Sequence, residues 1–158
     1  MPVRSLKDAV VKIADSGGTG GGNVVTVDVE DGTFSYSEHS PVNIISDRGV
    51  LDHARLANQE PIDVSMDMKF QSFSTHVSPS PYDAVTFTGG ASAWVSDEPN
   101  SDVNAVILEI VISDPAGGAS ETITIPRVAI ENIDFAEGDP SDSLTFSGRA
   151  VATRATLS

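Results

Sequence analysis

The sequence contains no cysteine among its 158 residues. This absence excludes a disulfide framework and any metal site that depends on thiolate ligands. Long apolar runs are also missing, and no segment approaches the roughly 20 apolar residues that a membrane-spanning helix needs. Near the N-terminus, residues 9–11 form a short apolar run that Lys12 interrupts, which does not match a secretory signal peptide. We therefore expect no membrane contact and no export by the common route.

Basic residues are scarce as well. Nine Lys and Arg stand against 23 Asp and Glu, which gives a net charge of −14. An acidic surface repels nucleic-acid phosphates and releases no counterions that could drive DNA binding. Two interpretations follow: the charge keeps the protein soluble, or it forms a surface to which DNA does not adhere.

Residues 61–73 show the clearest pattern in the chain. Apolar and polar residues alternate, and since the side chains of a strand point alternately to opposite faces, the segment has a dry face and a wet face. The dry face consists of Ile62, Val64, Met66, Met68 and Phe70. The wet face consists of Asp63, Ser65, Asp67, Lys69 and Gln71. This alternation predicts a long amphipathic strand.

Strand patterns dominate the rest of the chain. They cover residues 9–14, 24–30, 33–37, 103–113, 121–135 and 143–153. Pro126 interrupts the alternation of one long strand, which predicts a bulge or an edge there. One short helix is expected, beginning at Pro81 and stopped by Gly89, with Trp94 packing it onto the sheet. We predict a single domain over residues 1–158, all-β with one short helix, in which about seven or eight antiparallel strands form a β-sandwich or barrel.

Residues 40–60 depart from this regularity. The segment is polar and mixed in charge, and its apolar residues follow no clean period. A connection of about 20 residues is uncommon in a compact domain and usually has a function. We predict an arm or extended hairpin whose partner lies outside the domain. The candidate contact residues are Ile44, Ile45, Arg48, Val50, Leu51, Arg55 and Leu56.

No group of residues indicates catalysis. The glycine-rich residues 17–22 lack the Lys-Ser or Lys-Thr of a phosphate-binding loop. Two acidic clusters, at 97–102 and 137–142, do not have the ligand spacing of an EF-hand calcium loop. The histidines have no second ligand at metal-binding spacing; they are His39, His53 and His76. Three arginines are expected to pair with nearby carboxylates, namely Arg127, Arg149 and Arg154. We therefore expect no enzyme activity, no metal and no cofactor.

The order of these parts resembles the tail tube proteins of phages with long, non-contractile tails. The similarity lies in Gly-Val-Leu-Asp-His-Ala-Arg at residues 49–55, followed by Glu60-Pro61 and the alternating strand. It continues in residues 126–135, in Glu-Gly-Asp-Pro at 137–140 and in Leu-Thr-Phe-Ser-Gly at 144–148. The resemblance covers most of the chain in element order, through turn and alternation patterns rather than a fixed fingerprint.

This resemblance implies a structural protein of the virion, a subunit of the tail tube. Six copies would form a ring in which long strands join side by side into a continuous barrel around a channel. The rings would stack through the arm, and the channel would conduct double-stranded DNA from capsid to host without specific binding. The implied partners are other copies of the chain and the tail terminator, tape measure and distal tail proteins. The implied location is the virion tail, assembled in the host cytoplasm.

The residues also support a ring with an acidic channel independently of the resemblance. Long amphipathic strands leave edges that closure into a ring removes. Six copies of a chain with net charge −14 carry −84, and a lumen lined with carboxylates keeps phosphates off its wall. Asp63 and Asp67 on the wet face are the first channel-lining candidates, followed by Asp28 and Glu30, unless these faces lie toward outer solvent. Lys69 shares the wet face and would pair with Asp67 or with a carboxylate of a neighbouring subunit.

Three rival functions remain open. The same tube fold serves contractile tails and the tube of type VI secretion systems. A β-sandwich binding module, for capsid decoration or carbohydrate binding, would exist as a monomer or trimer with an exposed aromatic patch. The chain has only six Phe, two Tyr and one Trp, of which Tyr82 and Trp94 lie near a loop. A hydrolase on a β-sandwich would need a catalytic constellation that the sequence does not show.

Overall fold

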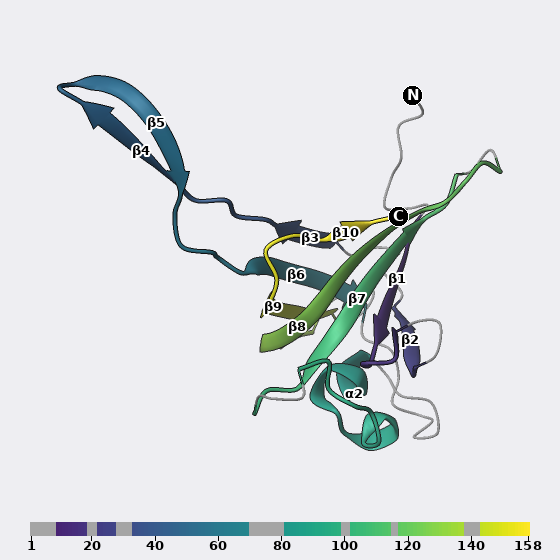
Figure 1. Ribbon diagram of the computed structural model, residues 1–158. Coiled ribbons are helices and arrows are strands. Elements are labelled where there is room, and N and C mark those ends of the chain that lie inside the picture. Colours follow the sequence, from purple (N-terminus) through teal and green to yellow (C-terminus); the bar gives the residue numbers. More distant parts are fainter. Residues whose placement is uncertain are drawn as a thin grey trace.

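The computed structural model describes residues 9–18, 22–27, 33–69, 81–98, 102–114, 117–137 and 143–158. Strands make up most of these residues (Figure 1). They are β1 (Ala9–Ala14), β2 (Val24–Val27), β3 (Thr33–Ser37), β4 (Val42–Asp47), β5 (Val50–Leu56), β6 (Ile62–Lys69), β7 (Ala105–Ile112), β8 (Glu121–Ala136), β9 (Ser143–Ala150) and β10 (Thr156–Leu157). One short α-helix, α2 (Pro81–Thr86), is followed by a 3₁₀ turn, η2 (Gly89–Ala91). The predicted all-β architecture with one short helix is confirmed.

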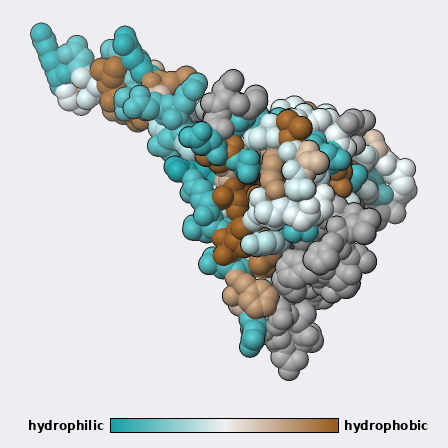
Figure 2. Space-filling model, turned by 90° about the horizontal axis from the view of Figure 1, so that it is seen from below, coloured by the Kyte–Doolittle hydropathy of each residue, from teal (hydrophilic) through white to brown (hydrophobic). Residues whose placement is uncertain are grey.

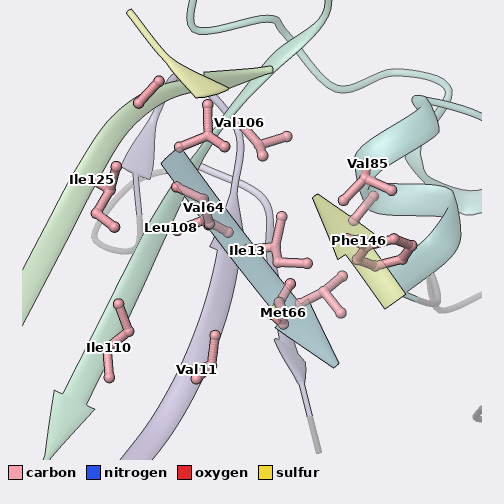
Figure 3. Packing of buried hydrophobic residues seen from close by; sticks show 14 of the residues in the cluster. Val11, Ile13, Val64, Met66, Val85, Val106, Leu108, Ile110, Ile125 and Phe146 are labelled. Atoms are coloured by element: carbon pink, nitrogen blue, oxygen red, sulfur yellow. The ribbon is translucent and has the colours of Figure 1, made fainter. Parts of the chain in front are cut away.

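One sheet contains every strand except β4 and β5. Its order is β2-β1-β7-β8-β9-β6-β3, with β10 beside β8, and all the pairings are antiparallel. The long β8 joins two halves of this sheet, because β7 pairs with its first part and β9 with its last part. Side chains from both halves, such as Ile13, Leu108, Met66 and Phe146, belong to one buried cluster (Figure 3). The two halves therefore cover one core, and the sheet does not close into a barrel.

The dry face predicted for residues 61–73 is confirmed in β6. Ile62, Val64 and Met66 are at most 4% exposed and lie in the buried cluster. On the opposite face the side chain of Asp63 is 59% exposed. The strand ends at Lys69, and residues 70–73 lie outside the described residues.

Pro126 marks the bulge that the sequence predicts. Val106 pairs with Val128, whereas Leu108 already pairs with Ile125, so β8 holds one more residue than β7 between these pairs. Arg127 in the bulge has a φ of 51°, and its backbone N–H donates to a carboxylate oxygen of Asp97 at 2.9 Å. Because the extra residue shifts the parity, Ile125 and Val128 both point into the core, at 0% exposure.

A second bulge in β8 is not apparent from the sequence. Ile130 pairs with Gly148 and Asn132 with Ser147, which leaves Glu131 as the extra residue. A β-carbon on Gly148 would collide with the backbone oxygen of Ala129, so this close approach of β8 and β9 requires glycine.

The helix lies against one end of the sheet, where it contacts β1, β2 and β7. It begins at Pro81, as predicted, and ends at Thr86, where the next residue, Phe87, adopts a φ of 56°. The predicted stop, Gly89, lies further on and is the first residue of η2. Trp94 is 8% exposed and shares the buried cluster with Val85 of α2. Its ring meets that of Phe87 edge-on, with centroids 6.4 Å apart. The predicted packing of the helix through Trp94 is thus confirmed. No helix in the described residues is both long and apolar enough to cross a membrane.

Asp15 fixes the end of β1 through its carboxylate. It is 4% exposed and accepts hydrogen bonds from the backbone N–H groups of Gly17 and Asn23, both at 3.1 Å, and from Nδ2 of Asn23 at 2.9 Å. The backbone N–H of Val95 donates to it at 3.4 Å. Desolvation raises the pKa of Asp15, but the hydrogen bonds outweigh it, so this pKa lies below its ordinary value of 3.8.

We expect the Asp15→Asn variant to be about 1–3 kcal/mol less stable than the native protein at pH 7, because the amide cannot accept all of these hydrogen bonds. Since the pKa is lowered by folding, this contribution is present above pH 3.8 and is lost as the pH falls through the folded-state pKa. Urea unfolding of both proteins from pH 7 down to pH 3 measures the difference. A difference that stays constant over this range would contradict the assignment.

Candidate functional site

Small polar side chains cover the outer face of β3, β6, β9 and the last part of β8. Because directly paired residues of neighbouring strands share a face, the register places these side chains together. We call this surface the polar face; it consists of Ser35, Ser37, Asp63, Ser65, Asp67, Thr145, Ser147, Arg149, Glu131, Asn132 and Asp134. It includes no large apolar side chain. The wet face of residues 61–67 is thus the centre of a wider polar surface.

Hydrogen bonds hold the charged groups of the polar face in place. Oγ1 of Thr145 donates to Oδ1 of Asp67 at 3.0 Å, and Nε of Arg149 donates to Oε1 of Glu131 at 2.6 Å. Oδ2 of Asp63 lies 2.9 Å from Nε2 of His39. These contacts hold the four charged side chains involved in fixed positions on the polar face.

The described charges on the polar face are mostly negative. Four carboxylates, of Asp63, Asp67, Glu131 and Asp134, stand against the guanidinium of Arg149, which leaves −3 per copy. Lys69, another channel candidate, pairs in register with Ser143, but its side chain lies outside the described ones, so the described sum stays at −3. Asp28 and Glu30, the other channel candidates, lie outside the described residues.

The hollows on this surface do not suggest a catalytic or metal site. The depression on the polar face has a volume of about 370 Å³, and serines and charged residues line most of it. Within the described residues, no three Asp, Glu or His side chains gather as metal ligands would. The predicted arginine pairs are present instead: Arg127 with Glu98 at 3.6 Å, Arg149 with Glu131 at 2.6 Å and Arg154 with Glu38 at 3.0 Å.

Residues 42–56 form the predicted extended hairpin, made of β4 and β5 (Figure 1). We call it the arm. It projects from the body of the protein, and every residue in its two strands is exposed. Arg48 and Gly49 form the turn between Asp47 and Val50, both with positive φ (52° and 80°), as a type I′ hairpin turn requires.

A bulge in the arm gathers its apolar residues on one face. Ile45 pairs with His53 but Ser46 with Leu51, so Asp52 is the extra residue. The shift places Leu51 on the same face as Leu56, although the two differ in parity. This arm apolar face consists of Val42, Ile44, Leu51, Ala54 and Leu56. The opposite face carries the remaining strand candidates, Ile45, Val50 and Arg55.

The arm apolar face is unusually exposed for its composition. Leu51 is 75% exposed, Leu56 83% and Ile44 66%. Figure 2 shows the resulting hydrophobic patches on the projecting part, next to hydrophilic ones. A two-stranded hairpin alone in water is only marginally stable, and an exposed apolar patch on it indicates a binding surface.

The polar face is bordered by strand edges that have no partner strand in the described part of the same copy. The order of the sheet places β3 at one end and β2 at the other, and residues 131–134 of β8 pair with β9 alone among the described strands. The polar face is therefore bounded by the outer edge of β3 on one side and by this part of β8 on the other. Neither edge is covered by a strand of the described part of the same copy.

Solved structures with the same arrangement belong to tail-like particles. A chain in the sheath/tube terminator of an extracellular contractile injection system, PVC, in its extended state has a TM-score of 0.62 at 9% identity, covering 100% of this chain and 97% of that one. A chain in the anti-feeding prophage baseplate, 6-fold symmetrised, has a TM-score of 0.60 at 10% identity, covering 99% and 96%. The chain therefore shares its fold with chains of these two particles.

A third structure with this fold comes from the tail of an empty GTA particle with C6 symmetry. Its TM-score is 0.51 at 14% identity, and 99% of each chain is covered. No protein-family model and no curated protein matches the sequence. The fold implied by the sequence resemblance is therefore confirmed by structure.

Proposed function

We propose that the protein is the subunit of a tail tube, in which six copies form a ring, the rings stack, and the polar face lines a channel for double-stranded DNA. The observation that carries this proposal is the polar face itself. It is a broad, net-acidic surface backed by a buried core, and both of its bordering strands have open edges.

The direction of the strands suits closure into a ring. Each copy contributes β8, β9, β6 and β3, which alternate in direction because every pairing is antiparallel. With an even number of strands, β3 of one copy runs antiparallel to β8 of the next. We call this border between two copies the seam; its strand pairing has the same geometry as the interior of the sheet. Six copies give a barrel of 24 strands, and sixfold symmetry is printed for two of the similar structures.

The chemistry of the polar face suits the passage of DNA. With the described charges of −3 per copy, a ring of six carries about −18 on its wall. Phosphates within a Debye length of about 8 Å are repelled by this charge, and hydroxyl groups of serine offer no fixed positive charge to hold them. DNA would therefore slide through the channel.

Disulfide cross-linking tests the proposed seam. Because the sequence has no native cysteine, only the introduced cysteines can form disulfides. Ser35 and Asn132 lie at opposite ends of one row of paired residues across the polar face. In the Ser35→Cys, Asn132→Cys double variant we expect oxidation to give a ladder of up to six copies on a non-reducing gel. Because barrel strands are staggered, Ser37→Cys with Asn132→Cys is the second pair to test.

The single cysteine variants are the controls, since neither can extend a ladder beyond a dimer. If neither double variant forms products larger than a dimer in concentrated protein, β3 and β8 do not form the seam. A ladder that stops at another number would replace the hexamer with that symmetry.

The proposed partners and location follow from this role. The subunit would associate chiefly with itself, and at the tube ends with terminator, tape measure and distal tail proteins. It would assemble in the host cytoplasm and act in the virion tail.

A second candidate is the tube of an injection particle that carries no DNA. It is favoured by the TM-scores, which are 0.62 and 0.60 for the injection-system and anti-feeding prophage chains and 0.51 for the GTA tail. Nuclease-protected DNA in purified native particles would support the virion tail, whereas protein cargo without DNA would support the injection particle.

A further inference from the structure

We propose that the C-terminal segment, residues 151–158, is a strap that holds the root of the arm and fixes the direction in which the arm projects. The strap makes the arm ready for assembly while the subunit is still alone. This inference rests on the proposed function only in giving the arm a partner.

The strap binds the first connection of the arm, residues 38–41 between β3 and β4, through Glu38. The backbone N–H of Ala155 donates to Oε1 of Glu38 at 2.8 Å, and Nη1 of Arg154 donates to Oε2 at 3.0 Å. Nη2 of Arg154 donates to Oγ of Ser40 at 2.7 Å. The hydrogen bond from Ala155, with Arg154 beside it, holds the pKa of Glu38 below its ordinary value. Two strap residues thus bind both ends of the segment that leads from β3 to the arm.

The strap also contacts the second connection, residues 57–61. The backbone N–H of Ile62 donates to the oxygen of Ala152 at 3.2 Å, at the point where this connection joins β6. One hollow between the strap and residues 59–61 is lined by Ala152 and Thr153, and another, at the root of the arm, by Thr153 and Arg154. The strap therefore contacts both connections that join the arm to the body.

Both ends of the strap are themselves anchored to the body. The backbone N–H of Val151 donates to the oxygen of Arg127 at 2.9 Å. At the far end, Thr122 and Ser158 exchange two backbone hydrogen bonds of 2.9 and 3.0 Å, and β10 pairs with β8. In Figure 1 the yellow C-terminal segment crosses from β9 past the base of the arm to β8. A segment fixed at both ends can transmit the orientation of the core to the arm.

The arm needs such a fixed root because it has no core of its own. All of its strand residues are exposed, and the two connections are joined at the root by the hydrogen bond from Ala57 N–H to the oxygen of Pro41 at 2.8 Å. The 7 residues of β5 span about 23 Å, so a swing of about 20° displaces the tip by about 8 Å. A displacement of that size exceeds what side-chain packing at an interface tolerates.

The strap contacts act on orientation rather than on stability. The side chain of Arg154 is 66% exposed and that of Glu38 is 24% exposed, and exposed ion pairs contribute little to the free energy of folding. The Arg154→Gln and Glu38→Gln variants are therefore expected to fold normally.

Spin-label distance measurements test the strap directly. Val50→Cys in the arm and Asp102→Cys on the body give the only two attachment sites in a chain without cysteine. The distance between the two labels is to be measured by pulsed electron paramagnetic resonance on dilute, unassembled subunits. In the Glu38→Gln, Arg154→Gln double variant we expect a distance distribution at least twofold wider than in the protein with the native strap. The matched control is Thr86→Val, which removes an exposed side-chain hydrogen bond in α2, at the other end of the sheet from the arm, and should leave the width unchanged.

Circular dichroism melts confirm that each variant is folded before its distances are interpreted. An unchanged width in the folded strap double variant would overturn the strap. Because the distances are measured in single subunits, that result leaves the tube proposal untouched. Conversely, a subunit that never forms tubes still shows whether the strap fixes the arm.

Discussion

Replacing residues 42–56 by Asn-Gly is expected to give a folded subunit that no longer forms tubes. Pro41 and Ala57 already share a hydrogen bond at the root, so two residues between them complete a tight turn. The deletion removes no buried side chain, and the melting temperature should change by only a few degrees. Loss of the exposed apolar surface should instead abolish polymerisation, which sedimentation and electron microscopy measure.

Point variants separate the two faces of the arm. Leu51→Ser with Leu56→Ser removes the two most exposed apolar side chains of the arm apolar face, and we expect it to reduce polymerisation almost as much as the deletion. Val50→Ser is the matched control, because Val50 is similarly exposed, at 68%, but lies on the opposite face. Long tubes formed by the deletion variant would show that the arm is not an assembly element.

Reversing two charges on the polar face is expected to turn a wall that repels DNA into one that retains it. In Asp63→Lys with Asp67→Lys each copy gains four positive charges, or 24 per ring of six, on top of about −18. The tubes should still form, since each carboxylate makes only one hydrogen bond of about 1 kcal/mol. Short labelled DNA should co-sediment with these tubes at least about tenfold more than with native tubes, and salt should reverse this.

The control is the replacement of two acidic residues by lysine on another surface of the protein. Asp102→Lys with Glu121→Lys changes the net charge equally, but neither residue belongs to the polar face. In a phage that carries each double variant, we expect infectivity to fall for the polar-face variant alone. Equal DNA retention by both variants, or unchanged infectivity, would remove Asp63 and Asp67 from the channel.

The sequence predicts the elements whose pattern is local. Alternation from Ile62 to Met66 identifies the buried side of β6, and the proline at 126 identifies the bulge in β8. The helix begins at Pro81 as expected, because proline acts on its own backbone, but it ends at Thr86, before the expected stop at Gly89, where Phe87 adopts a positive φ. In each case the physical cause lies within a few residues of its effect.

What the sequence does not reveal depends on pairing between distant segments. The bulge at Asp52 hides the period of the arm, because Leu51 and Leu56 look as if they were on opposite faces until their partners are known. The bulge at Glu131 has no local marker, and the cause of the close approach is Gly148 on the neighbouring strand. Strand β10 has only two residues, too few for any periodicity. The seven or eight strands expected for the domain agree with the eight-stranded sheet, and the predicted arm adds β4 and β5.

The candidate site was predicted in part. Asp63 and Asp67 were expected on a wet face, and they lie at the centre of the polar face. The contribution of Glu131 and Asp134 was missed, because it follows only from the pairing of β8 with β9. The contact of Arg154 with Glu38 spans 116 residues and leaves no pattern that a single sequence could show.

Electron microscopy of the purified protein at high concentration tests the central claim most directly. Negatively stained samples should contain rings, and tubes built from stacked rings, with sixfold symmetry and an open centre. Particles that remain single subunits or trimers at every concentration, with no central opening, would contradict the tube.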